Sequence, residues 1–231
     1  MKAQRLRFTY RVGEAGCSLG QRDLIRAWEQ ATTDAGLALS YSEGKRKTAQ
    51  IAVAAPLPQN VTSEGELVEV FLSEPVDPRA ALKAISERLP QGIEAVDVEE
   101  VGVQAPSLQS QLRWADYEVE LPSEVDEAAA RDAVERLLAE TTIPAEYRRE
   151  TRVRQYDLRP LVLSLRVEGK HDGRVLLGMR LRAEPENNAR ADQVVLALGV
   201  AEATRIRRRR LHLEDVQAVL LAYRRAGEEE S

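Results

Sequence analysis

The first hundred residues divide into six segments of strand or helix character, and the order of these segments most limits the possible folds. Alternation of polar and apolar side chains with a period of two predicts the strands, and apolar residues three to four positions apart predict the helices. The six predicted segments are the strand 5–12, the helix 24–35, the strands 48–54 and 66–72, a helix beginning at Asp77–Pro78, and the strand 93–98. This order is typical of the ferredoxin-like arrangement, a four-stranded antiparallel sheet with two helices on one face.

The same order of segments is predicted to begin again further along the chain. The second set comprises the strand 116–121, a helix capped by Ser123, extended segments 151–156 and 161–167, the strand 174–182, a short helix 192–198, the strand 204–213 and a final helix 213–226. We therefore predict an α+β protein with two tandem ferredoxin-like (βαββαβ) lobes, each an antiparallel sheet with helices on one face. The predicted domains are a first lobe 1–102, a linker 103–112, a second lobe 113–226 with a basic strand, and an acidic tail 227–231.

The composition excludes several kinds of site. There is no run of about 18 apolar residues, so no membrane span is predicted, and the first residues lack the apolar core of a signal peptide. We therefore expect a cytoplasmic protein.

The single Cys17 excludes an internal disulfide and a multi-cysteine zinc or iron–sulfur site. No phosphate-loop or dinucleotide-binding glycine spacing is present, and we predict neither a cofactor nor a metal.

Arginine is concentrated in two short stretches although the formal net charge of the chain is −5. Residues 205–210 hold five arginines in six positions, and residues 147–154 hold four more. Basic side chains outnumber acidic ones in residues 1–54 and 143–225, whereas acidic ones dominate residues 55–142. A segregated basic surface is typical of a protein that binds a polyanion.

The arginine-rich strand has two interpretations. Alternation counted from the inward-facing Leu211 and Leu213 divides its polar side chains between two faces. The outer face is then predicted to carry Arg208, Arg210 and His212, and the side toward the sheet or its rim Arg207 and Arg209. Guanidinium groups at this density suit phosphate, which they bind bidentately. Alternatively, the glutamates of residues 94–127 neutralise these arginines within the protein.

Two other basic segments are candidates for the same ligand. In the first, Tyr156 is expected on one strand face with two arginines, where its ring would either stack on a base or pack against the core or its rim. In the second, the basic loop tip Lys45–Lys47 would either close over a ligand or be a solvated turn. The predicted nucleic-acid-binding residues are Lys45, Arg46, Lys47, Arg148, Arg149, Arg152, Arg154, Tyr156, Arg207, Arg208, Arg209 and Arg210.

Several motifs along the chain are shared with one known family. They are Tyr41-Ser42 with Gly44, Pro56-Leu57-Pro58, Ala105–Ser110, Ala115–Val119 and Tyr156–Val162. In this order they resemble the radical-SAM-linked protein family, a bacterial domain of unknown function encoded beside, or fused to, radical S-adenosylmethionine proteins. The resemblance runs from Arg5 to about Glu214 and implies a radical-SAM protein as partner. It does not imply radical chemistry in this chain, which has only Cys17 and so lacks the cluster-binding cysteines.

The chain departs from the family pattern at two places. Members often read Leu-Ser-His-Leu-Asp where this chain has Leu19–Asp23, and Gly-Phe-Asn-Pro where it has Gly44–Lys47. These departures put the pocket chemistry of the family in doubt for this chain. The possible pocket comprises Gln21, Arg22, Asp23, Tyr41 and Ser42.

Three functions follow from these patterns. We predict a non-catalytic accessory protein of a radical-SAM system that binds RNA or another phosphate-rich ligand through an arginine-rich face. The first alternative is a protein–protein adaptor without nucleic acid. The second is an RNA-processing endoribonuclease, for which His212 beside the arginines is the only candidate base. Neither His171 nor His212 has a partner at motif spacing, so we predict no catalytic residue.

Overall fold

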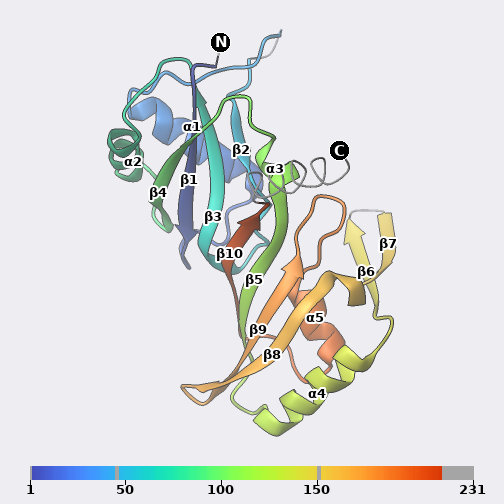
Figure 1. The fold of residues 1–231 in the computed structure, drawn as a ribbon. Helices are drawn as coiled ribbons and strands as arrows, with labels where there is room; N and C mark the ends of the chain where they lie inside the picture. The colour runs from blue at the N-terminus through green and yellow to red at the C-terminus, as the bar shows by residue number, and fades with distance from the viewer. Residues whose placement is uncertain (1, 45–46, 150–151, 215–231) are drawn as a thin grey trace, which may run out of the picture.

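A computed structural model describes residues 2–44, 47–149 and 152–214 (Figure 1). Within these ranges the chain forms a mixed α+β fold, with one eight-stranded, mostly antiparallel sheet and a separate two-stranded hairpin. None of the helices in the described ranges has the length and apolar character needed to cross a membrane. Most of the predicted final helix 213–226 and all of the acidic tail lie outside the described residues.

The first half of the chain contains the six predicted elements in the predicted order. They are β1 (Gln4–Val12), α1 (Gln21–Asp34), β2 (Ile51–Val53), β3 (Val61–Leu72), α2 (Pro78–Ser86) and β4 (Ile93–Val101). The strands lie in the order β4-β1-β3-β2, and neighbouring strands are antiparallel. Both helices pack against one face, where Phe8 and Tyr10 surround Trp28. Asp77 caps α2 as predicted, because its carboxylate accepts a hydrogen bond from the Ala80 amide.

The second half contains four more elements than a βαββαβ unit requires. Its elements are α3 (Leu108–Gln111), β5 (Leu112–Glu120), α4 (Glu127–Ala139), β6 (Pro144–Arg149), β7 (Arg152–Asp157), a 3-10 turn (Arg159–Leu161), β8 (Val162–His171), β9 (Arg174–Arg182), α5 (Ala191–Leu198) and β10 (Arg205–Leu213). The main strands lie in the order β10-β5-β9-β8, and neighbours are antiparallel. The predicted cap of α4 was wrong: Asp126, not Ser123, accepts hydrogen bonds from the first free amides.

The two halves are joined into one sheet through β3 and β10. These strands pair in parallel, with Ile206 opposite Val61 and Arg208 opposite Ser63. The strands come unusually close, since a side chain at Gly65 would place its Cβ 3.0 Å from the carbonyl oxygen of Arg209. Each half keeps its own apolar core, one beneath α1 and α2 and the other beneath α4 and α5. The arginine-rich strand therefore lies at the centre of the sheet, not at an edge (Figure 1).

Candidate anion-binding site

The arginines of β10 lie beside carboxylates of the two flanking strands. Nη1 of Arg207 lies 3.0 Å from a carboxylate oxygen of Glu64 on β3 and 3.4 Å from one of Glu118 on β5. Arg209 lies 2.8 Å and 2.7 Å from the same two glutamates. Both arginines are therefore paired within the protein, by Glu118 of the predicted range 94–127 and by Glu64 outside it. Arg210 is exposed and forms no ion pair with any residue that the structure describes.

Arg208 lies inside the protein and binds Glu66 of β3. Its side chain is 3% exposed and that of Glu66 is 0% exposed. Nε and Nη2 of Arg208 donate to the two carboxylate oxygens, with 2.7 Å between Nε and Oε1, and the guanidinium also donates to the carbonyl oxygens of Ala55 and Pro56. Burial disfavours the charged form, but the Glu66 carboxylate and the Tyr117 hydroxyl outweigh it and raise the pKa of Arg208. Arg208 is therefore a clamp between the two halves and is not available to a ligand.

A β-bulge explains why the predicted faces of this strand were wrong. Arg208 stands opposite Tyr117, but Arg210 stands opposite Asp116, so Arg209 is an extra residue between the two pairs. The alternation therefore reverses on passing Arg209. Arg208 faces the interior instead of the solvent, and Arg207, predicted to lean toward the sheet, faces outward with Glu118.

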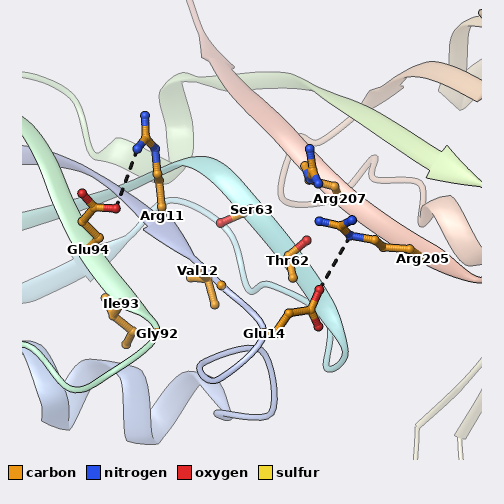
Figure 2. A pocket seen from close by; sticks show the side chains of 11 residues that line it. Arg11, Val12, Glu14, Thr62, Ser63, Gly92, Ile93, Glu94, Arg205 and Arg207 are labelled. Atoms are coloured by element: carbon orange, nitrogen blue, oxygen red, sulfur yellow. Dashed lines mark ion pairs between the residues drawn. The ribbon is translucent and has the colours of Figure 1, made fainter. Parts of the chain in front are cut away.

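A pocket opens at one end of the sheet, where β1 ends and β3, β4 and β10 begin (Figure 2). Its volume is about 360 Å³. The lining residues whose side chains carry hydrogen-bond donors are Arg11, Thr62, Ser63, Arg205 and Arg207. Two glutamates stand at its walls: Glu94 lies 3.7 Å from Arg11, and Glu14 lies 3.6 Å from Nε of Arg205. Guanidinium and hydroxyl groups converging on one cavity suit an oxyanion.

A second polar cluster lies where β5, β9 and β10 run side by side. The carboxylate of Asp116 accepts two hydrogen bonds from Arg180, at 2.7 Å and 2.9 Å, and lies 2.8 Å from Nε2 of His212. The His212 ring stacks on Trp114 with 5.6 Å between ring centroids, and the Arg180 guanidinium lies 5.7 Å from the Trp114 ring. Partial burial opposes ionisation of Asp116, but the hydrogen bonds and charges of Arg180 and His212 lower its pKa below the ordinary 3.8.

We expect the replacement Asp116→Asn to destabilise the protein at neutral pH and to have less effect in acid. The folded carboxyl group binds its proton less tightly than the unfolded one. Asp116 therefore stabilises the fold above the unfolded-state pKa, near 3.8, and this contribution is lost as the pH falls through the lower folded-state value. Urea unfolding of both proteins at neutral pH and below about pH 4 measures the difference. The exposed Glu124→Gln is the control, and a deficit of Asp116→Asn that is the same at every pH would contradict the expectation.

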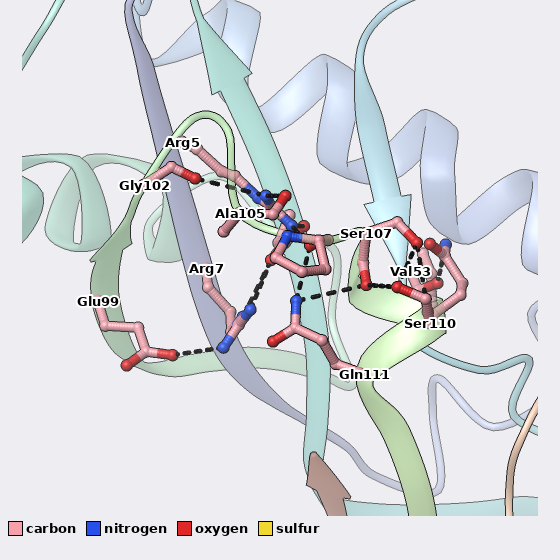
Figure 3. A network of polar contacts seen from close by, with 12 residues as sticks. Arg5, Arg7, Val53, Glu99, Gly102, Ala105, Ser107, Ser110 and Gln111 are labelled. Carbon is pink, nitrogen blue, oxygen red and sulfur yellow. Dashed lines mark hydrogen bonds and ion pairs between the residues drawn. The ribbon is translucent and has the colours of Figure 1, made fainter. Parts of the chain in front are cut away.

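The predicted linker 103–112 packs against the sheet through a buried arginine (Figure 3). Arg5, whose side chain is 2% exposed, donates to the carbonyl oxygens of Ala105 and Pro106 at 2.7 Å and 2.8 Å. It also pairs with the buried Glu69 at 2.7 Å, and Arg7 binds the other oxygen of that carboxylate. The segment is thus fixed in place by hydrogen bonds to the first half of the chain.

The second predicted basic segment forms a hairpin of its own. β6 and β7 pair with each other, with Tyr147 opposite Arg154 and Arg149 opposite Arg152, and over the described residues they form a sheet separate from the eight-stranded one. Tyr156 is partly buried against the apolar core of the second half, which favours packing as its role. A contribution of Arg148 and the other arginines of this hairpin to ligand binding stays a prediction.

The remaining predicted residues lie in two separate places. Gln21, Arg22 and Asp23 form the first turn of α1, just after Cys17, whose carbonyl oxygen accepts a hydrogen bond from the residue before the start of β3. Tyr41 and Ser42 follow Leu39, which pairs with the last residue of β3. The length of β3 therefore separates the two groups of the predicted pocket, and the structure does not bring them together. Lys45 and Arg46 lie outside the described residues, and Lys47 is exposed.

Of the five donor residues that line the pocket, Arg207 alone was among the predicted binding residues. Arg205 was seen as part of the basic stretch 205–210 but was not assigned to the ligand, and Arg11 was placed in the first predicted strand. The third strand was predicted to begin at residue 66, so Thr62 and Ser63 lay before it. Val61, three residues after Pro58, was the apolar signal that β3 begins earlier.

Comparison with solved structures finds the following similar chains. A chain of a Cbf5–Nop10–Gar1 complex is 13% identical with a TM-score of 0.49, and the match covers 94% of this chain and 51% of that chain. A chain of an archaeal box H/ACA sRNP Nop10–Cbf5 complex is 13% identical, with a TM-score of 0.42 and coverages of 90% and 47%. A chain of an H/ACA RNP bound to a substrate RNA containing 2′-deoxyuridine is 14% identical, with a TM-score of 0.43 and coverages of 89% and 46%.

The present chain therefore spans about half the length of these solved chains. No curated protein matches it. Residues 5–191, most of the chain and nearly the whole region of the motif resemblance, match the family model described as an uncharacterized protein conserved in bacteria, DUF2344. The chain belongs to this family of uncharacterized bacterial proteins, DUF2344.

Proposed function

We propose that this chain is a non-catalytic module that binds RNA on the outward face of β5, β9 and β10. The observation that carries the proposal is the cluster in which Trp114, His212 and Arg180 lie against one another. Unpaired bases of RNA stack on aromatic rings and on guanidinium planes, and nearby cations hold the phosphates. Arg180 is 44% exposed, so a ligand can reach it from solvent.

The internal ion pairs limit how strongly such a ligand is held. Arg207 and Arg209 each have two glutamate partners, so a phosphate that approaches them must compete with carboxylates. Arg210 has no carboxylate partner among the described residues and is the arginine of β10 best placed to release counterions. We therefore expect stacking to supply much of the affinity, with a shallow dependence on salt, about −0.7 in the logarithmic slope for each phosphate neutralised.

Binding of a labelled single-stranded RNA across a salt series tests this proposal. We expect Arg210→Glu to weaken binding several-fold, because it reverses a charge on the binding face that has no carboxylate partner in the described part of the chain. Arg26→Glu, on the exposed surface of α1, is the matched control and should leave binding unchanged. Absence of binding even at low salt, or equal losses in the two variants, would contradict the proposal. Cleavage of the RNA that disappears in His212→Ala would contradict the non-catalytic role.

The internal neutralisation of Arg207 and Arg209 favours a second function, a protein–protein adaptor without nucleic acid. A basic strand whose charges are already matched has less need of a polyanion. From the motif resemblance alone, we propose a radical-SAM protein as the partner. Co-purification of the two proteins at high salt and free of nucleic acid would favour the adaptor.

We also propose that each half of the chain is a ferredoxin-like unit. When the main strands of each half are numbered in chain order, both halves have the order 4-1-3-2, with antiparallel neighbours throughout. In the second half the β6–β7 hairpin is then an insertion between the first helix and the second strand. This interpretation is supported by the pairing of the strands and by the separate apolar core of each half.

A further inference from the structure

We propose that the pocket formed at the ends of β1, β3, β4 and β10 binds the phosphate group of a phosphate monoester. The pocket has its own residues, apart from the Trp114 cluster, so the proposal does not rest on the RNA-binding face. Its donors come from three strands distant in the sequence, namely Arg11 of β1, Thr62 and Ser63 of β3, and Arg205 and Arg207 of β10 (Figure 2).

Two unsatisfied hydroxyl groups in the pocket wall point to a ligand. Thr62 is 6% exposed and Ser63 is 4% exposed, and both line the cavity. Oγ1 of Thr62 and Oγ of Ser63 have no hydrogen-bond partner among the residues that the structure describes, and neither does Nε of Arg205. Buried polar groups almost always have a partner. Two adjacent hydroxyls and a guanidinium N–H left without one at the same cavity are explained by an acceptor that completes the site.

The ion pairs across the pocket are of the kind that a ligand can displace. Arg11 and Glu94 are 3.7 Å apart, and Nε of Arg205 and Glu14 are 3.6 Å apart, beyond hydrogen-bonding distance. Glu94 is 67% exposed and Glu14 is 76% exposed, so both can turn into solvent when an anion enters.

Closer contacts hold the β10 arginines in position. Arg205 lies 3.3 Å from Glu120, and Arg207 lies 3.0 Å from Glu64. Each guanidinium has five N–H donors, so these pairs orient the arginine and leave donors for a ligand.

The charge and size of the pocket favour a monoester. Among the residues that line the pocket, three arginines face two loosely held glutamates. Arg205 and Arg207 also pair with Glu120, Glu64 and Glu118 outside the lining, so a group that carries more than one negative charge competes best for their remaining donors. A phosphate monoester carries about −1.5 to −2 at neutral pH, whereas an internal phosphate of a nucleic acid carries a single charge. The volume of about 360 Å³ accommodates the phosphate and a small attached group. Either a small phosphorylated compound or the phosphorylated end of an RNA fits this chemistry.

Calorimetric titration of the purified protein with inorganic phosphate and with ribose 5-phosphate tests the proposal. We expect saturable binding that Ser63→Ala and Arg11→Met each weaken about tenfold, a loss of about 1.4 kcal/mol. Ser63→Ala is the most informative variant. Removal of a hydroxyl without a partner among the described residues should leave the urea midpoint unchanged or raise it, while the affinity for phosphate falls. Arg26→Met is the matched control for the arginine variant and should bind like wild type.

Two RNA oligonucleotides, with a 5′-phosphate and with a 5′-hydroxyl, distinguish the sources of the phosphate. If the phosphorylated RNA binds more tightly than the sugar phosphate and Ser63→Ala removes this advantage, the pocket binds an RNA end. If the sugar phosphate binds more tightly, the pocket binds a small molecule. No binding of either phosphate probe, or equal binding by wild type and both pocket variants, would overturn the proposal. RNA binding unaffected by Ser63→Ala would then still leave the RNA-binding face in place, so the two proposals can fail separately.

Discussion

Replacing Arg208 by methionine should lower the free energy of unfolding by about 3–5 kcal/mol, the largest loss expected from a single substitution in this chain. The substitution leaves the carboxylate of Glu66, which is 0% exposed, without its bidentate partner. It also removes the guanidinium N–H groups that donate hydrogen bonds to the carbonyl oxygens of Ala55 and Pro56. A buried charge without a partner is far less stable than either an ion pair or an apolar replacement. The loss of unfolding free energy therefore exceeds the net stabilisation that the ion pair provides. Urea unfolding measures it.

A double variant and a neighbouring arginine supply the controls. Arg208→Met combined with Glu66→Leu should recover most of the loss, since it removes both charges from the interior. Arg210→Met, two residues along the same strand, should change stability by less than about 0.5 kcal/mol because Arg210 is exposed. If the single variant does not fold but the double variant does, the loss comes from the buried Glu66 carboxylate without a partner and not from disruption of β10. A double variant less stable than Arg208→Met alone would contradict the account.

The second large effect is expected from Gly92→Ala, with a loss of about 3 kcal/mol. Gly92 has a φ of +89°, and a Cβ at this position would lie 2.3 Å from the backbone nitrogen of Gly16. The new side chain therefore meets both an unfavourable backbone conformation and a backbone that cannot move aside. The hydrogen bond from the Gly13 amide to the Gly92 carbonyl oxygen would also be disturbed.

Gly102→Ala is the matched control for Gly92→Ala. Apart from its two chain neighbours, no described residue has a heavy atom within 4 Å of a Cβ at Gly102, and its backbone is not in the left-handed region. We expect a change within about 1 kcal/mol, with a slight gain if the unfolded chain loses freedom. Equal urea midpoints for the two variants would show that the contact between residues 16 and 92 does not hold the pocket wall in place.

The order of the elements could be predicted from periodicity because each main strand or helix buries one face. The predictions failed where that pattern is weak or interrupted. β6 was missed, since Pro144–Arg149 has little apolar alternation. β3 proved longer than predicted, because Gly65 interrupts the strand where β10 approaches it closely. Near α4, Ser123 and Asp126 both have cap chemistry, and their distances to the helix amides decide between them.

The site was less accessible to sequence reasoning than the fold. A single bulge residue, Arg209, reverses the faces of the arginine strand, and nothing in five nearly consecutive arginines marks which one is extra. The partner of Arg208 lies 142 positions away in the sequence, and the acidic range considered for internal pairing did not include it. The pocket depends on strand ends brought together by the parallel pairing of β3 and β10, which local patterns do not encode.

We propose that the basic strand divides into a structural clamp, Arg208, and pocket arginines whose remaining donors are available to a phosphate group. NMR spectra of the arginine side-chain Nε–Hε groups, recorded during titration with ribose 5-phosphate, test this claim directly. We predict that the signals of Arg11, Arg205 and Arg207 shift and saturate together, while that of the buried Arg208 stays in place. A shift of Arg208 with the others, or small unsaturated shifts of every exposed arginine alike, would contradict the claim.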